Sequence, residues 1–435
     1  MASLHTELAA VVGAEHLLAD PEQCAAYAVQ GVTPGCVAAP GSLEELSAVL
    51  RVAAAHRAAV APWGGGTQQL IGAPPERLDL VVRTGRLSRV LTHEPDDLTI
   101  SVEAGMTLAA LREHLARHRQ MLPVDAPLPS RATIGGLIAT AADGPRRLGY
   151  GTLRDLLIGI TVVEADGRVS RGGGMVVKNV SGFDMMKLYL GSFGTLAVIA
   201  SANFKLLPAP RAAGSLLCRF DTPAQAFAAA DALQQTQLTP TAVEYLNAAA
   251  LAGLDTGQAA ATGPAQCGLL ARAEGLLQAV ERHLSEMGAI AERSGARAIE
   301  RLEGAQEAQL WEQVADLPQT AALAPGEAVV KLSVLPGDVE QVATRVEAFA
   351  AAADGSALIG ARALSGVIYA RLRGLDGPVL SGTLAELPGV QWVATDLPGV
   401  PRWGPPPQGI EVMQRIKREF DPHTMLNPGR FVPGI

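Results

Sequence analysis

The chain has 435 residues, of which 48% are hydrophobic and only 4% aromatic, and its formal net charge is -8. At ~150 residues per domain, this length predicts two or three domains with sizeable cores. The acidic balance argues against a broad basic surface for nucleic acid. No apolar run of about 18 residues is present, so we expect no transmembrane segment.

The N-terminal segment has acidic residues early and no basic region, which predicts no signal peptide and a cytoplasmic location. The cysteines are far apart and form no C-x-x-C pair: Cys24, Cys36, Cys218 and Cys267. This spacing excludes a ferredoxin-type iron–sulfur site within the chain. It favours ordinary small core residues in a reducing cytosol.

The first clear element is a helix over residues 42–57, where Ser42 and Glu45 form a capping box. The strand predicted at 58–63 runs into three consecutive glycines. Further along the chain, the patterns predict strands at 78–82 and 98–104 and a helix at 107–118 capped by Thr107. Residues 157–171 then read as a β-hairpin around Asp166-Gly167.

Residues 194–210 alternate apolar and polar side chains, which predicts a long half-buried strand that Pro208 and Pro210 end. Beyond this point the chain becomes Ala-rich, with scattered strands such as 328–335. We therefore place one domain at 1–210 and a second, smaller one at 211–405. A Pro-rich stretch then leads into a C-terminal segment, 406–435, which contains a helix and an irregular tail.

The stretch "APWGGGTQQL", residues 61–70, combines a strand end with bare backbone. Three glycines allow close approach of a ligand, and their successive amides can form a nest for a phosphate. The motif is neither a nucleotide P-loop nor a Rossmann fingerprint. A tight turn between strand and helix is the alternative interpretation.

A second glycine pair, in "SRATIGGLIAT", places Thr133, Gly135 and Gly136 at the opening of a short helix. Free amides and the positive end of a helix dipole also favour phosphate. Two such loops could hold the two phosphates of a dinucleotide from opposite sides.

Two of the eight histidines, His114 and His118, have the i, i+4 spacing of a metal-binding pair on a helix. The helix face that carries them lies opposite Leu108, Leu111 and Leu115, and no H-E-x-x-H motif is present. We therefore interpret both as solvent-facing residues and expect no metal. His423, just after Asp421-Pro422, is predicted to lie in a turn.

Four motifs in chain order resemble the FAD-binding domain of the vanillyl-alcohol-oxidase type, the PCMH family. They are P-x-G-G-G-T, T-I-G-G-x-I-A-T, Y-G-x-x-R-D and G-x-D-x-x-K-L-Y-x-G-S-x-G-T-L-A-V-I. The resemblance covers roughly residues 30–210 and the closing segment "REFDPHTMLNPGRF". It implies an α+β fold in which a FAD-binding domain of two α+β subdomains carries a smaller α+β cap domain.

The resemblance also implies which residues bind FAD, with the two glycine loops holding its pyrophosphate. The residues carried over are Pro62, Trp63, Gly64, Gly65, Gly66, Thr67, Gln68, Pro127, Thr133, Ile134, Gly135, Gly136, Thr140, Gly149, Gly151, Val198, Ile199 and Asn427. Trp63 stands where many members of the family have Arg. Members that attach FAD covalently often have His in or just after the first loop; Thr67 and Gln68 occupy that place here, so noncovalent FAD is expected.

The catalytic residues stay unknown at this point. Family members that oxidise 2-hydroxy acids typically carry an HxGDGNxH-like segment in the cap, and residues 211–405 contain none. Arg362, Arg371 and Arg373 could bind a carboxylate, but we interpret them, with Lys331, as surface charges. For Glu244 and Tyr245, candidates to lie over the flavin, we expect a role at the edge of the core.

Within the family, the chain resembles the short FAD-binding E-type subunit of bacterial glycolate oxidase more than the longer catalytic D-type subunit. This implies a D-type FAD subunit and an iron–sulfur subunit as partners, a small 2-hydroxy acid as substrate, and a cytoplasmic complex peripheral to the inner membrane through those partners. Two alternatives stay open: a self-sufficient 2-hydroxy acid dehydrogenase, and a structural subunit whose flavin site has decayed.

Overall fold

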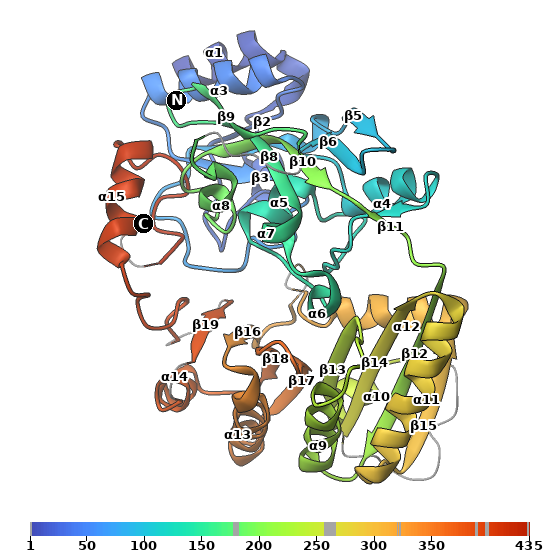
Figure 1. Cartoon of the computed structure of the whole chain (residues 1–435). Coiled ribbons are helices and arrows are strands. Elements are labelled where there is room, and N and C mark those ends of the chain that lie inside the picture. The colour runs from blue at the N-terminus through green and yellow to red at the C-terminus, as the bar shows by residue number, and fades with distance from the viewer. Residues whose placement is uncertain are drawn as a thin grey trace.

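The chain forms two lobes in its computed structural model (Figure 1). The structure describes residues 2–176, 182–255, 267–319, 321, 323–387, 390–395, 400–432 and 435. The N-terminal lobe contains the strands up to residue 208 and the final helix, and the sheet lobe contains the strands between residues 212 and 394. Helices and mainly antiparallel sheets occur in both lobes, which confirms the expected α+β class.

The first sheet of the N-terminal lobe has four strands, and three helices pack near it. Its elements are β1 (Leu17–Leu18), β2 (Cys36–Ala38), β3 (Val60–Trp63), β4 (Leu80–Arg83), α1 (Ala2–Val12), α2 (Pro21–Ala25) and α3 (Leu43–Ala55). The strand order is β1-β2-β4-β3, and β2, β4 and β3 are parallel. At the start of α3, Ser42 Oγ accepts the amide of Glu45 as predicted, but the Glu45 carboxylate accepts the amide of Gly41, so only half of the capping box is present.

The second sheet of this lobe is antiparallel, with the order β5-β6-β10-β8-β9. Its strands are β5 (Val90–Glu94), β6 (Thr99–Glu103), β8 (Leu157–Val163), β9 (Val169–Gly173) and β10 (Val198–Lys205). The predicted hairpin is β8–β9. In β10, Val198, Ala200, Ala202 and Phe204 are buried. On the other face of the strand, Ser201, Asn203 and Lys205 are half-buried, as the alternation predicted.

Short elements connect and cover these sheets. They are α4 (Leu108–Ala116), β7 (Gln120–Met121), α5 (Ile134–Ala139), α6 (Arg147–Tyr150), α7 (Leu153–Leu156), α8 (Met185–Tyr189) and β11 (Leu207–Pro208). Thr107 Oγ1 accepts the amide of Ala110 and so caps α4 as expected. The sequence segment that ends in β10 and resembles the family begins at residue 178. Its first residues, 178–181, lie outside the described residues.

The sheet lobe is built on one eight-stranded antiparallel sheet. Its strands are β12 (Ala212–Phe220), β13 (Ala242–Asn247), β14 (Cys267–Gly275), β15 (Ala298–Glu303), β16 (Glu327–Ser333), β17 (Ser356–Arg362), β18 (Val367–Arg373) and β19 (Gln391–Ala394). Their order is β15-β12-β14-β13-β17-β18-β16-β19. The helices are α9 (Pro223–Gln234), α10 (Ala248–Ala252), α11 (Leu277–Arg293), α12 (Gly304–Asp316), α13 (Val339–Ala352) and α14 (Gly377–Ala385).

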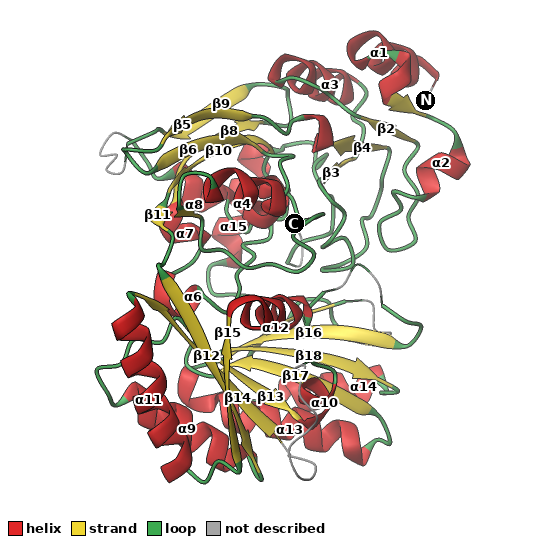
Figure 2. Ribbon diagram, turned by 90° about the vertical axis from the view of Figure 1, so that its right-hand side faces the viewer, coloured by secondary structure: helices red, strands yellow, loops and turns green. Residues whose placement is uncertain are grey.

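The two faces of this sheet have different neighbours (Figure 2). One face packs against α9, α11, α13 and α14 in the largest hydrophobic core, which includes Tyr245. The opposite face, which α12 partly covers, is turned toward the N-terminal lobe. Because side chains alternate along a strand, Glu244, Lys331, Arg362 and Tyr369 lie on this second face.

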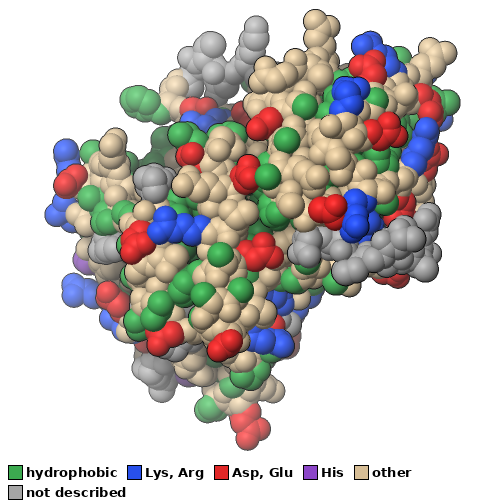
Figure 3. Space-filling model, turned by 90° about the horizontal axis from the view of Figure 1, so that it is seen from below, with side chains coloured by type: hydrophobic (Ala, Val, Ile, Leu, Met, Phe, Trp, Pro, Cys, Tyr) green, Lys and Arg blue, Asp and Glu red, His purple; other side chains and the backbone are tan. Residues whose placement is uncertain are grey.

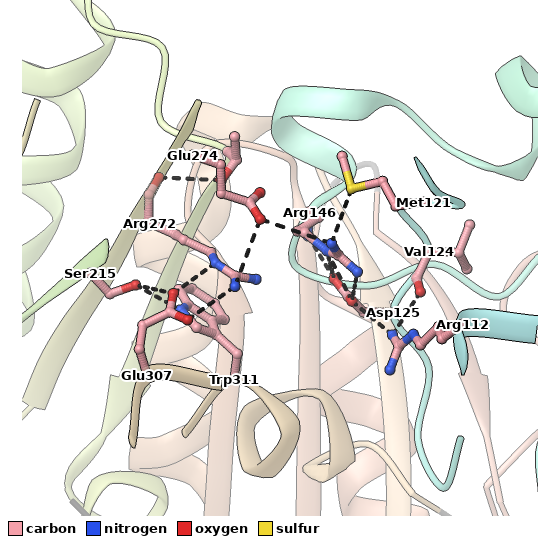
Figure 4. Close-up of polar contacts among 11 residues, drawn as sticks. Arg112, Met121, Val124, Asp125, Arg146, Ser215, Arg272, Glu274, Glu307 and Trp311 are labelled. Atoms are coloured by element: carbon pink, nitrogen blue, oxygen red, sulfur yellow. Dashed lines mark hydrogen bonds and ion pairs between the residues drawn. The ribbon is translucent and has the colours of Figure 1, made fainter. Parts of the chain in front are cut away.

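A chain of charged side chains lies where the two lobes meet (Figure 4). On the N-terminal lobe, Asp125 accepts hydrogen bonds from Arg112 at 3.1 Å and from Arg146 at 2.8 Å. Burial by itself would raise the pKa of Asp125, but the charges of Arg146 and Arg112 hold this pKa well below its usual range. Arg146 also lies 3.9 Å from Glu274 of the sheet lobe.

The sheet lobe continues this network through Arg272, which pairs with Glu307 at 2.7 Å. Glu307 accepts the hydroxyl of Ser215, which in turn accepts the indole N–H of Trp311 at 2.8 Å. Removing one member of a buried charge network leaves its partner uncompensated. The network therefore holds the two lobes in one relative arrangement.

The final helix, α15 (Ile410–Phe420), returns the chain to the N-terminal lobe. The buried ammonium of Lys417 donates to Asp421 at 2.6 Å, to the carbonyl of Leu426 and to the carbonyl of Thr195. The next residues continue beside β3, where the amide of Asn427 donates to the carbonyl of Val60 at 2.8 Å. His423 lies in the turn between these two contacts, as predicted.

The surface seen from below carries acidic and basic side chains interspersed, without a continuous area of one sign among the side chains drawn (Figure 3). Among the described residues, no helix combines the length and the apolar character that a bilayer span requires.

Candidate functional site

A cleft opens where β3 ends, and we call it the glycine cleft. It encloses about 730 Å³, including its opening to solvent. The residues that line it come from the segment after β3, from α5, from the segment before β10 and from the C-terminal segment. They are Pro62, Trp63, Gly64, Gly65, Gly66, Thr67, Gln68, Gln69, Thr84, Thr133, Gly135, Gly136, Ala139, Thr140, Phe193, Gly194, Ala197, Val198, Ile199, Asn427 and Arg430.

The packing of the three glycines explains why no side chain is tolerated there. A Cβ on Gly65 would lie 1.8 Å from the carbonyl oxygen of Arg131, and one on Gly64 would lie 2.0 Å from Thr133 Oγ1. Gly66 has a φ of +69°, a conformation that favours glycine. Within the described parts of the chain, the amides of all three glycines have no protein acceptor. They are therefore available to an anionic ligand in the cleft.

The second glycine loop behaves differently from the expectation. The amides at the start of α5 already have partners: Ile134 donates to Met106 O at 2.9 Å, Gly135 to Ala104 O at 2.7 Å, and Gly136 to Thr133 Oγ1 at 3.4 Å. A Cβ on Gly135 would lie 2.8 Å from the Cβ of Ala104. The T-I-G-G glycines thus allow α5 to pack closely against its neighbours and support the first loop, and their amides are not free for phosphate.

Most of the residues carried over from the resemblance line the glycine cleft, but four do not. Ile134 is fully buried in the core behind it. Gly149 packs against Thr241 of the sheet lobe, and Gly151, with a φ of +78°, lies beside Asp155. Pro127 lines a different cavity.

The C-terminal segment closes one wall of the cleft. Asn427 donates from Nδ2 to the carbonyl of Phe193 at 2.6 Å, while its buried Oδ1 has no protein partner. Arg430, which the sequence reading missed, donates to Gln69 and to the carbonyl of Ile71; burial lowers its pKa to about 10, so it stays charged at neutral pH. Its position three residues after Asn427, in the "NPGRF" segment, could have indicated that Arg430 lies at the cleft.

The cleft continues toward the sheet lobe as a second cavity of about 730 Å³, which we call the chamber. Gln68, Thr140 and Phe193 line both. The N-terminal lobe also contributes Ile71, Pro127, Ala142 and Asp143, and the sheet lobe contributes Pro318, Val329, Lys331, Tyr369 and Val393. The chamber is therefore an apolar space with a few polar groups, typical of a small-ligand site.

Lys331 brings a cation to the chamber wall from the middle of β16. Its ammonium lies 5.8 Å from the centre of the Tyr369 ring, and none of the described carboxylates lies within ion-pair distance of it. The interpretation of Lys331 as a surface charge is wrong. Strand pairing places it opposite Tyr369 on the face turned toward the N-terminal lobe.

The interpretation of Arg362 as a surface residue is also wrong, because only 4% of it is exposed. Its guanidinium donates to the carboxylate and to the carbonyl of Asp143 across the lobe boundary. Burial would raise the pKa of Asp143, but the charges of Arg362, Lys331 and Arg147 hold this pKa below its usual value. Asp143 is thus an ionised acceptor already engaged with two arginines.

Arg371, Arg373 and Tyr245 make contacts within the sheet lobe and do not line the chamber. Arg373 is exposed and pairs with Glu327, and Arg371 donates to the carbonyl of Gln319. Tyr245 is buried in the core on the far face of the sheet, beside Phe227. The expected core role is therefore right for Tyr245.

Glu244 lies on the near face, next to Arg362. Burial raises its pKa to about 8, since Arg362, 3.8 Å away, is already engaged with Asp143 and only partly offsets the desolvation. The Oε1 atom of Glu244 has no hydrogen-bond partner among the described residues. The carboxyl group is therefore protonated at neutral pH.

This raised pKa predicts a pH-dependent stability. A buried acid with a folded pKa of about 8 and an unfolded pKa near ~4.3 contributes stability that is complete below the lower value and is lost as the pH rises through the higher one. Relative to a Glu244→Gln variant, the wild type should lose about 1.4 kcal/mol of unfolding free energy per pH unit between ~5 and ~8. Urea unfolding of both proteins across this range measures the difference. The exposed Glu113→Gln variant is the control, and an equal pH dependence of all three proteins would contradict the prediction.

Comparisons with known proteins agree with this architecture. A family model described as "FAD binding domain" matches residues 34–173, and one described as "FAD linked oxidases, C-terminal domain" matches residues 209–369 and 405–431. Among solved structures, p-cresol methylhydroxylase shares the fold with a TM-score of 0.76 and 16% identity, covering 100% of this chain and 96% of that one. An alkyldihydroxyacetonephosphate synthase gives a TM-score of 0.78 at 17% identity, covering 99% and 86%.

The curated relatives with similar sequences include subunits of glycolate oxidase and a D-2-hydroxyglutarate dehydrogenase. The glycolate oxidase subunit GlcD of Bacillus subtilis is 26% identical over 91% of this chain and 88% of its own length. The glycolate oxidase subunit GlcE of Escherichia coli is 36% identical over 35% of this chain and 43% of its own. The D-2-hydroxyglutarate dehydrogenase of Xanthomonas citri is 37% identical over 45% and 42%. The last two alignments thus span less than half of those relatives.

The group implied by the family fits the glycine cleft. The pyrophosphate of FAD can accept hydrogen bonds from the three free amides of Gly64, Gly65 and Gly66. The polar edge of the flavin ring can donate to the unpartnered Oδ1 atom of buried Asn427. Both features come from this chain's own geometry. The chain belongs to the PCMH-type family of FAD-linked oxidases and is a FAD-dependent oxidoreductase.

Proposed function

We propose that this chain is a FAD-binding subunit of a glycolate oxidase complex that oxidises a small 2-hydroxy acid and passes the electrons to other subunits. The observation that carries the proposal is the continuity of the glycine cleft with a chamber in which Lys331 makes no ion pair within 4.0 Å with a described carboxylate. A cation in an apolar chamber suits the carboxylate of a small acid. The names of the relatives, glycolate oxidase and 2-hydroxyglutarate dehydrogenase, support this class of substrate.

In this proposal the residues carried over by the resemblance that line the cleft hold the cofactor. The amides of Gly64, Gly65 and Gly66 bind the pyrophosphate, and Asn427 contacts the ring system. When bound, FAD supplies the acceptor for the hydride of the substrate. Lys331 binds the carboxylate, and Tyr369 and the apolar walls exclude water.

The described residues that line the chamber include no histidine and no unengaged carboxylate to act as a base for the substrate hydroxyl, and this favours a complex. The histidine between residues 211 and 405, His283, lies on α11 and accepts the amide of Thr239, away from the chamber. Asp143 is engaged with Arg362 and Arg147. We infer that a D-type FAD subunit supplies the base that completes the substrate chemistry and that an iron–sulfur subunit receives the electrons, in the cytoplasm or at the inner membrane.

A self-sufficient 2-hydroxy acid dehydrogenase is the second candidate. The chamber already offers a carboxylate-binding cation, and the alignment with the Bacillus GlcD subunit spans 91% of this chain. Anaerobic addition of glycolate or lactate to the purified chain distinguishes the two. We expect the flavin to stay oxidised in the lone chain and to be bleached when the chain is co-purified with its tagged neighbours, whose flavin and iron are counted. Bleaching of the lone chain would instead establish the second candidate, and a flavin-free preparation would favour a structural subunit.

We also propose that FAD is bound noncovalently. No histidine, cysteine or tyrosine occurs among the described residues that line the glycine cleft, and these nucleophilic side chains are the ones that attach covalently to flavin. Precipitation of the native protein with trichloroacetic acid should therefore release the flavin into the supernatant. Yellow colour retained in the washed pellet would show a covalent bond.

A further inference from the structure

Three histidines meet on the outer edge of the N-terminal lobe. His93 comes from the edge strand β5, His114 from α4 and His118 from the turn after α4. One ring nitrogen from each lies within 4.8 Å of the others. The i, i+4 pair of the sequence is therefore joined by a third imidazole, 21 residues before His114. His118 is exposed, as expected, and His114 is half-buried beside His93.

The hydrogen bonds of Gln120 fix which nitrogen of His93 carries the proton. The Nε2 atom of the buried Gln120 donates to the carbonyl of Pro95 at 2.7 Å, so the amide oxygen points the other way. That oxygen lies 2.8 Å from His93 Nε2, which must therefore be the protonated nitrogen. The Nδ1 atom of His93 then carries a lone pair, which can accept a hydrogen bond or bind a cation.

This lone pair faces a second imidazole nitrogen. His93 Nδ1 lies 3.1 Å from His114 Nε2. Tetrahedral Zn²⁺ with bonds of about 2.0–2.1 Å places two ligand nitrogens about 3.3–3.4 Å apart.

The geometry points to a divalent transition-metal site formed by His93, His114 and His118, with Zn²⁺ as the cation that three imidazoles suit. Gln120 is a positioning residue, because it orients His93 in the way that an outer carbonyl or carboxylate orients most metal-binding histidines. His118 is exposed, so the fourth coordination position faces solvent and takes water. The residues of this site are separate from those of the glycine cleft and the chamber.

Zinc titration of the chelator-stripped, full-length protein against a chromophoric zinc indicator tests the site. We expect one equivalent of Zn²⁺ to bind with micromolar or tighter affinity, and Co²⁺ in its place to give the visible absorption of a tetrahedral site. His118→Ala removes an exposed ligand without disturbing the core and should weaken binding at least ~10-fold, in line with the 10–100-fold cost of losing even an outer partner. His93→Gln should do the same.

The matched control is His423→Ala, which removes an exposed histidine in the turn after α15. It should bind Zn²⁺ as the wild type does, and thermal unfolding monitored by circular dichroism checks that each variant is folded. The inference is overturned if the wild type binds no stoichiometric Zn²⁺ in the micromolar range, or if His118→Ala and His93→Gln both bind it as tightly as the wild type.

Discussion

Replacing Gly65 with alanine should lower the affinity for FAD by about 10–100-fold. The added Cβ would lie 1.8 Å from the carbonyl oxygen of Arg131, which is backbone and cannot turn aside, so the loop must move away. This movement would withdraw the amides of Gly64, Gly65 and Gly66 from the pyrophosphate that we propose they bind. A hydrogen bond to a charged group contributes about 1.5–3 kcal/mol, and each 1.4 kcal/mol is a factor of ten in affinity.

The measurement is the ratio of flavin to protein after purification, followed by titration of the apoprotein with FAD. Gly337→Ala is the matched control, since its Cβ meets no atom within 4 Å and its φ is ordinary. It should bind FAD as the wild type does. Circular dichroism separates a loss of FAD from a loss of fold. A folded Gly65→Ala protein with wild-type flavin content and affinity would show that this loop does not hold the pyrophosphate.

Replacing Lys331 with methionine should weaken binding of a small carboxylate by about 10–100-fold while leaving FAD bound. Methionine keeps most of the volume of the side chain and removes the charge that faces the chamber. The loss corresponds to one charge-assisted hydrogen bond of about 1.5–3 kcal/mol. Because the amides that we propose to hold FAD lie in the glycine cleft and not in the chamber, the flavin content should not change.

Oxalate, a dicarboxylate that resembles glycolate, gives a readout that needs no turnover: its binding is followed through the visible spectrum of the flavin. If the complex is active, the same change should appear as a raised KM for glycolate. Lys205→Met is the control, because Lys205 lies on the outer face of β10. Equal oxalate affinity of the wild type and Lys331→Met would remove Lys331 from the substrate site.

Much of the secondary structure could be predicted from the sequence because its causes are local. The alternation along β10 and the caps of α3 and α4 depend on neighbours within a few residues, and the structure has them where they were predicted. The glycine loop after β3 was recognisable for the same reason, since adjacent glycines mark backbone that must come close to another group.

The residues that contact these local features in the folded chain could not be predicted from the sequence. The amides of α5 were expected to be free, but Ala104 and Met106 accept two of them through contacts that only the folded chain creates. In the same way, nothing local to His114 and His118 indicated that His93 would join them from β5.

By itself, the sequence determined the family and the strand and helix pattern, and it located the glycine loop that we propose to bind the cofactor, because each of these depends on residues close together in the chain. The tertiary structure alone decided which charges are buried. Arg362 and Asp143 are 219 residues apart, and they meet only because the sheet lobe docks on the N-terminal lobe. The register of β16 and β18 likewise turns Lys331 into the chamber, because a shift of one residue would place it on the other face of the sheet.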